Sequence, residues 1–185
     1  KNNIGNYCFT KFEKMDKPML DIEQCWYPIL KNQIVKNNMK LGNKFRNNAL
    51  VTGPNAGGKS TFIKSLSLSI IFSQTLTISP ARKFSMTPFS LINTYLNIPD
   101  CKGVESLFEA EMRRSLNYIN LLKKMKPDKF SFVIMDEIFS STNPEEGISG
   151  AYAIAEKISS FNNNISIITS HYSYLSNLEN TKKFT

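Results

Sequence analysis

Hydrophobic positions along this 185-residue chain follow two alternating patterns. Short apolar runs are typical of strands buried on both faces, and they lie at 49–52, 89–98, 130–135 and 165–169. Apolar residues at helical spacing are typical of amphipathic helices, and they lie at 62–71, 106–125 and 148–161. Strands that alternate with helices predict an α/β fold with a mostly parallel central sheet and helices on both faces.

The two ends of the chain carry weaker patterns. Residues 1–24 are charged and poorly periodic, so we expect a linker or the end of a preceding element. The stretches 26–30 and 34–41 predict short strands joined by turns. We expect these strands to form a small β lead-in at the start of one domain over 25–185. Because the chain has no initial Met and ends without a closing helix, we expect this domain to be truncated at its C-terminal end.

Composition narrows the function classes only slightly. A hydrophobic content of 41% suits one domain with a proper core. The net charge of +8 favours contact with nucleic-acid phosphates, but heavy use of Asn, Lys and Ile, as in AT-rich coding, explains it equally well. We see no membrane span and no signal peptide. Three cysteines without metal spacing favour a reducing intracellular compartment, in the cytoplasm, the nucleus or wherever the DNA is kept.

A glycine-rich loop follows the first apolar run of the core, where a strand should lead into a helix. Its pattern Gly-x-x-x-x-Gly-Lys-Ser predicts a phosphate-binding loop, because glycines let backbone N–H groups approach a dense anion. Lys59 would supply charge to the β- and γ-phosphates and Ser60 would hold Mg²⁺. The predicted nucleotide-binding residues are Gly53, Pro54, Asn55, Ala56, Gly57, Gly58, Lys59, Ser60 and Thr61.

Two acids follow the apolar run 130–135. Asp136 would be delivered to the phosphate side of the sheet, where a carboxylate can support Mg²⁺. Glu137 can polarise a water for in-line attack on the γ-phosphate. A Glu directly after the Asp is typical of ATPases of the ABC type.

Two further residues stand next to predicted elements. His171 is the only histidine, and at the carboxyl end of the strand 165–169 it would face the same crevice as Lys59. There it can hydrogen-bond the γ-phosphate or the attacking water. Ser106 and Glu109 form a capping box at the start of a helix. The same geometry would let Ser106 hold the γ-phosphate of a nucleotide on a neighbouring subunit, and the residues alone leave both readings open.

In this order, the four motifs resemble the ATPase domain of the MutS family of DNA mismatch-repair proteins. The loop 52–61 is similar to the family's Thr-Gly-Pro-Asn-Met-Gly-Gly-Lys-Ser-Thr, with Ala56 in place of Met. The stretch 135–147 resembles its Walker B and D-loop, with Phe-Ser-Ser in place of Gly-Arg-Gly. The stretches 106–112 and 169–172 resemble its Ser-Thr-Phe-x-x-Glu-Met signature and its Ala-Thr-His-Tyr switch.

The resemblance implies a P-loop NTPase of ABC type that uses ATP and Mg²⁺. It implies a homo- or heterodimer through the ATPase face, in which Ser106 acts in trans, and it places Ile34 where an aromatic residue stacks on adenine. Lys59, Glu137 and His171 are the implied catalytic groups, and Ser60 and Asp136 the metal ligands. Contact with mismatched double-stranded DNA is implied only for domains that this chain lacks.

The expected function is therefore ATP binding and hydrolysis that drive the conformational cycle of a MutS-like mismatch-repair protein. One alternative is a nucleotide-gated dimerisation module with weak hydrolysis, motivated by the altered D-loop. Another is a different ABC-type ATPase, such as a chromosome-cohesion head or a transporter subunit. The absence of Leu-Ser-Gly-Gly before the signature helix disfavours the transporter.

Overall fold

A four-stranded parallel sheet forms the centre of the structure, a computed structural model that describes residues 6–30, 34–54, 57–95, 106–140 and 142–185. Across the sheet its strands are β5 (Asn48–Thr52), β10 (Asn164–Ser170), β9 (Ser131–Asp136) and β8 (Leu91–Tyr95). All three pairings are parallel. The four apolar runs are thus confirmed as strands, although β8 is shorter than the run 89–98, whose last three residues lie outside the described part.

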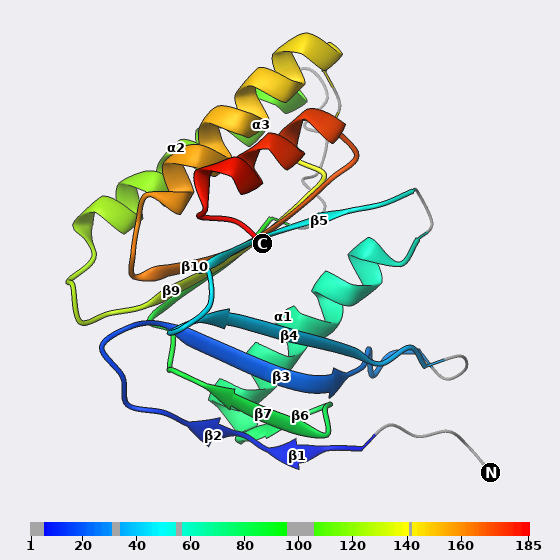
Figure 1. Ribbon diagram of the computed structural model, residues 1–185, viewed down its shortest axis with the longest axis vertical. Helices are drawn as coiled ribbons and strands as arrows, with labels where there is room; N and C mark the ends of the chain where they lie inside the picture. The colour runs from blue at the N-terminus through cyan, green and yellow to red at the C-terminus, as the bar shows by residue number, and fades with distance from the viewer. Residues whose placement is uncertain (1–5, 31–33, 55–56, 96–105, 141) are drawn as a thin grey trace.

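Helices cover both faces of this sheet (Figure 1). The helix α1 (Lys59–Leu76) lies on one face, and α2 (Leu107–Lys124) and α3 (Pro144–Ser159) lie on the other. Side chains of β9 alternate between the two resulting cores: Phe132 packs in the core on the α1 side, and Val133 packs in the core with α2 and α3. The predicted parallel sheet with helices on both faces is confirmed.

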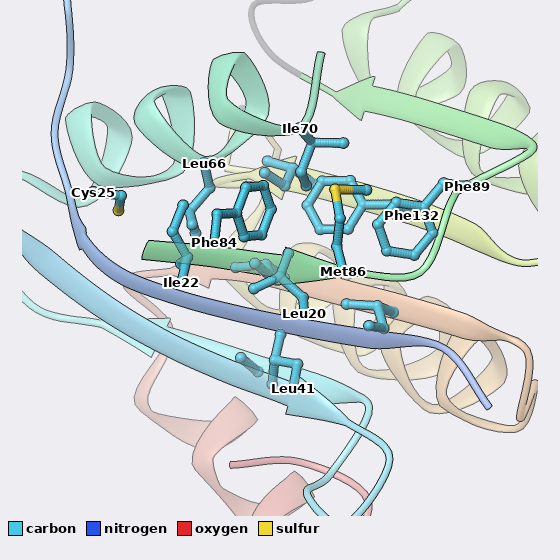
Figure 2. Close-up of a cluster of buried hydrophobic side chains, with 14 of the residues drawn as sticks. Leu20, Ile22, Cys25, Leu41, Leu66, Ile70, Phe84, Met86, Phe89 and Phe132 are labelled. Carbon is cyan, nitrogen blue, oxygen red and sulfur yellow. The ribbon is translucent and has the colours of Figure 1, made fainter. Parts of the chain in front are cut away.

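A second sheet packs against α1 from the side away from the parallel sheet (Figure 1). Its order is β2 (Lys11–Phe12), β7 (Lys83–Met86), β3 (Met19–Cys25) and β4 (Asn37–Gly42). Beside it β1 (Cys8–Phe9) pairs with β6 (Ile78–Ser79). Figure 2 shows the buried core between this sheet and α1, which includes Leu20, Ile22, Phe84, Leu66 and Ile70.

Two expectations for the N-terminal part are wrong. The described part of 1–24 supplies strands to this sheet rather than a linker, because Leu20 and Ile22 alternate with Asp21 and bury one face of β3. The stretch 26–30 is not a strand. Pro28 lacks an N–H for a ladder, and the backbone instead turns so that Leu30 N–H donates to the Tyr27 carbonyl at 3.2 Å.

The C-terminal segment folds back onto the parallel sheet. A 3₁₀ helix, η1 (Ser173–Thr181), packs beside α3 through Leu175 and Leu178. Phe184 is fully buried, and the backbone of Thr185 exchanges hydrogen bonds with β5. Within the part of the chain that the structure describes, no helix has the length and apolar character needed to cross a membrane.

Candidate functional site

The register of the parallel sheet brings the predicted site residues to one edge. Thr52 at the end of β5 pairs with Ser170 of β10, and Thr169 of β10 pairs with Asp136 of β9. The chain therefore leaves the sheet at neighbouring points toward the glycine-rich loop, toward Glu137 and toward His171. The carboxyl ends of parallel strands are where ligands of open α/β sheets bind.

The glycine-rich loop opens directly into α1. Gly58 precedes the helix at φ +85°, a left-handed conformation that glycine adopts without a Cβ penalty. Gly58, the N-cap residue, has no side chain that could cap this N-terminus, and the first turn of α1 contains no acid. The N–H groups of a helix's first turn have no partner within the helix, so they carry a partial positive charge toward the loop.

Lys59, the first residue of α1, lies beneath the loop. Its side chain is buried, and Nζ donates hydrogen bonds to the Gly53 carbonyl at 2.8 Å and the Pro54 carbonyl at 3.1 Å. Nζ also lies 3.4 Å from Oε1 of Glu137, whose side chain is partly exposed. The loop lysine and the predicted general base are therefore in direct contact. Asn55 and Ala56 lie outside the described residues.

Thr169 connects the two acids of the edge. Its hydroxyl donates to Oδ1 of Asp136 at 2.6 Å and accepts the Glu137 N–H at 2.9 Å. The same N–H also points to the Thr169 carbonyl at 3.1 Å. Thr169 fixes the end of β9 relative to β10. Sequence reasoning placed Thr169 at the start of the stretch 169–172 without giving it a role.

A cleft connects α1, β9 and the start of α2. Ser60, Asp136 and Glu137 line it together, so the two predicted metal ligands share one space. Its other lining residues are Tyr95, Leu107, Glu111 and Ser140. The described residues contain no cluster of three or more His, Cys, Asp or Glu side chains placed to hold a metal. A donor set of one hydroxyl and one carboxylate fits Mg²⁺, which commonly keeps waters and takes phosphate oxygens as its remaining ligands.

A larger cavity of about 530 Å³ lies beside the glycine-rich loop, between α1 and β4. Ile34, predicted at the adenine position, lines it together with Gly58 and Lys59. Tyr27 lines it as well and supplies an aromatic ring. Sequence reasoning placed Tyr27 in the lead-in without giving it a role. The size lies within the 300–1,000 Å³ range typical of small-molecule sites.

His171 and Ser106 lie at the edges of this region. His171 directly follows β10 and is exposed, with its ring 4.4 Å from the ring of Tyr172, and it is not among the described residues that line either cavity. Ser106 is exposed at the N-terminus of α2, where the predicted capping box with Glu109 is present. The next residue, Leu107, lines the cleft of the same chain.

Glu111 is the functional candidate that sequence reasoning did not single out. It is 7% exposed, and burial raises the pKa of its carboxyl group. Oε2 accepts the N–H of Phe139 at 3.0 Å. Its only sequence signal was its place in the stretch 106–112.

These features define a class: an α/β domain with a glycine-rich loop, a lysine and two acids at the carboxyl edge of its parallel sheet. Comparison with known proteins then gives the family. The family model for MutS domain V matches residues 49–185, and the chain belongs to the MutS family.

Two relatives illustrate the similarity. The chain is 30% identical to the DNA mismatch repair protein MutS of Persephonella marina over 176 residues, which cover 92% of this chain and 19% of that protein. It is 28% identical to the endonuclease MutS2 of Bacillus velezensis over 171 residues, which cover 89% of this chain and 21% of that protein. The chain thus spans about a fifth of the length of these curated relatives.

Proposed function

We propose that this chain is a P-loop ATPase module of the ABC type, in which Mg²⁺–ATP binding and hydrolysis drive the conformational cycle of a MutS-like DNA mismatch-repair protein. One observation carries the proposal. The N-cap residue of α1 is a glycine, its first turn contains no acid, and its first residue is the buried Lys59, whose Nζ lies 3.4 Å from Oε1 of Glu137. Unpaired N–H groups and a buried lysine at one point favour a polyanion.

The triphosphate would lie over the glycine-rich loop. Lys59 would exchange its bonds to the Gly53 and Pro54 carbonyls for bonds to the β- and γ-phosphates. The first-turn N–H groups of α1, which include that of Thr61, would bind the remaining phosphate oxygens. Ile34 and Tyr27 line the adjoining cavity, which would take the base and ribose.

The acids at the end of β9 would serve the metal and the water. Ser60 and Asp136 would hold Mg²⁺, which neutralises phosphate charge when bound. Glu137 would accept a proton from the attacking water once Lys59 has turned to the phosphates. His171, which follows β10, would sense the γ-phosphate.

The partners follow from the family. One relative is named a DNA mismatch repair protein, so we infer that this module acts on mismatched duplex DNA through other parts of its protein. We also infer a homo- or heterodimer in which Ser106 reaches the nucleotide of the other subunit. Its exposed position at the N-terminus of α2 suits this role.

Glu137→Gln in the intact protein tests the proposal. Because the amide cannot accept the proton, we expect turnover measured by phosphate release to fall by about 10³-fold, within the range for loss of a general base. ATP should still bind, and the variant should accumulate as an ATP-bound dimer in size-exclusion chromatography. Unchanged turnover in this variant would exclude Glu137 as the base.

A second candidate is a nucleotide-gated dimerisation module with weak hydrolysis. The ion pair between Lys59 and Glu137 favours it, because a base held by the loop lysine is less free to bind water. Steady-state phosphate release from the intact protein separates the two. Tight ATP binding with no turnover above background would support the dimerisation module.

A further inference from the structure

The peptide groups of Phe139 are bound from two sides. Its N–H donates to Oε2 of Glu111 on α2 at 3.0 Å, and its carbonyl accepts the hydroxyl of Tyr172 at 2.8 Å. Tyr172 is the residue after His171, just beyond β10. One residue of the loop after β9 is therefore held both by the helix that begins at Ser106 and by the segment that carries His171.

This double contact lies next to the proposed base. Only Ile138 separates Phe139 from Glu137. The two residues on either side of Ile138 have positive φ, +49° at Glu137 and +59° at Phe139. Such values cost energy in residues other than glycine, so surrounding contacts must hold them. On the other side, the Glu137 N–H is bound by Thr169 at 2.9 Å. Fixed points before and after it determine where the Glu137 carboxylate lies.

Burial makes these contacts specific. Phe139 is fully buried, and Glu111 and Tyr172 are 7% and 8% exposed. A buried polar group without a hydrogen-bond partner is unfavourable, so breaking either contact would cost free energy. Packed interfaces between moving elements switch between discrete arrangements, so a movement of one element can shift the residues that it contacts.

Glu111 is itself tied to the sheet. The hydroxyl of Tyr95, at the end of β8, donates to the Glu111 carbonyl and is in turn contacted by the Ser115 hydroxyl at 3.3 Å. The guanidinium of Arg114 lies 4.8 Å from the centre of the Tyr95 ring. Because Glu111 belongs to α2, a shift of α2 that broke these contacts would move the Glu111 carboxylate relative to the Phe139 peptide.

We propose that Glu111 and Tyr172 are positioning residues that orient Glu137 through the two hydrogen bonds of Phe139, so that α2 and the His171 segment both control when the base is placed for hydrolysis. This inference rests on the proposed function, because it requires Glu137 to be the base. It adds two residues to which that function assigned no role.

The glycines of α3 provide a way to disturb this contact without removing either partner. A Cβ at Gly147 would lie 2.6 Å from both the Phe139 carbonyl oxygen and the Tyr172 hydroxyl oxygen. Gly147→Ala should therefore force the two groups apart. A Cβ at Gly150, one turn further on, would meet ring atoms of Phe139 and Phe108 at ordinary distances of 3.5 and 3.6 Å. Gly150→Ala is the matched control.

The experiment measures ATP turnover and the affinity for a fluorescent ATP analogue in the intact protein, below the unfolding temperature of every variant. Glu111→Met, Tyr172→Phe and Gly147→Ala each remove or displace one contact. Because misplacement by about 1 Å can cost about 100-fold, we expect kcat to fall by roughly 10- to 100-fold in each variant while the analogue's affinity stays within about threefold. Glu111→Gln keeps an acceptor for the Phe139 N–H and should recover most of kcat.

Two results would overturn the inference: normal kcat in both Tyr172→Phe and Gly147→Ala, or a loss in Gly150→Ala as large as in Gly147→Ala. A Glu111→Met variant that fails to fold leaves the decision to the other two variants. Glu137→Gln separates this failure from failure of the proposed function. If Glu137→Gln loses turnover while the positioning variants keep it, only the inference fails. If Glu137→Gln keeps turnover, Glu137 is not the base and the inference fails with that assignment. If the wild-type protein neither binds nor hydrolyses ATP, the proposed function itself fails.

Discussion

The helices α1 and α2 have the same length and begin beside the same cleft, but their N-termini are capped differently. At α2 the Ser106 hydroxyl accepts the Glu109 N–H at 3.2 Å, and the Glu109 carboxylate accepts the Ser106 N–H at 3.1 Å. At α1 the N-cap residue is Gly58, which has no side chain, no acid lies in the first turn, and the first helical residue is Lys59.

The difference separates stability from binding. The capping box satisfies the N–H groups of Ser106 and Glu109 from within the chain, and its acid complements the helix dipole. In α1 the N-cap residue Gly58 offers no side chain to the first-turn N–H groups, and Lys59 adds positive charge where an acid would stabilise the helix. A helix start that lacks local stabilisation in this way is suited to an anionic ligand.

Among variants that test this difference between α1 and α2, Lys59→Ala should have the largest effect, on ATP affinity. Charge-assisted hydrogen bonds to phosphate are worth about 3 kcal/mol at most, so ATP affinity should fall by about 100-fold in isothermal titration calorimetry. Lys64→Ala, on the same helix, is the control and should bind ATP normally. Equal affinity in the Lys59→Ala and wild-type proteins would exclude the loop lysine from phosphate binding.

A smaller effect, of opposite sign for stability and binding, should follow from Thr61→Glu. An acid in the first turn of α1 should raise the free energy of unfolding by about 0.5 kcal/mol through the helix dipole. The same charge beside the phosphates should weaken ATP binding by about fivefold, since unit charges 4 Å apart in water interact by about 1 kcal/mol. Urea unfolding and calorimetry measure the two.

The matched control lies at the other end of the same helix. Thr75 is also exposed, near the C-terminus of α1. Thr75→Glu places the acid against the negative end of the dipole, so it should slightly lower stability and leave ATP affinity unchanged. Should both variants weaken binding equally, the effect would come from net charge rather than from the helix start.

The smallest effect on ATP binding should come from variants at the start of α2. Ser106→Ala removes the cap and should lower the free energy of unfolding by about 1 kcal/mol. Ser106→Asp keeps a capping acceptor, so stability should be retained, whereas the negative charge should reduce turnover if this position meets a γ-phosphate across a dimer. Wild-type turnover in Ser106→Asp would restrict Ser106 to its capping role.

Much of this architecture was predictable from the sequence because its signals are local. The strands β9 and β10 are continuous apolar runs, and the capping box fixed the start of α2 to the residue. Lys59, Asp136 and Glu137 could be proposed as site residues from the sequence because each directly follows an apolar run or a glycine-rich loop. Parallel register then brought them together, as expected for strands that end at one edge.

What the sequence could not provide depends on contacts between distant segments. The strand β3 was missed because its short alternation gains meaning only when β4 and β7 pair with it. Glu111 and Tyr172 meet the Phe139 peptide across 28 and 33 residues of sequence. A hydrogen bond to or from a backbone group leaves no trace in the pattern of side chains, so only the folded chain reveals it.

The most direct test is a structure of the intact protein with Mg²⁺ and a non-hydrolysable ATP analogue. We predict that the β- and γ-phosphates lie within hydrogen-bond distance of Lys59 Nζ and of the first-turn N–H groups of α1, with Mg²⁺ on Ser60. The N-terminus of α2 should keep its Ser106–Glu109 capping box. An analogue bound elsewhere, or phosphates that leave the first turn of α1 uncontacted, would contradict the account.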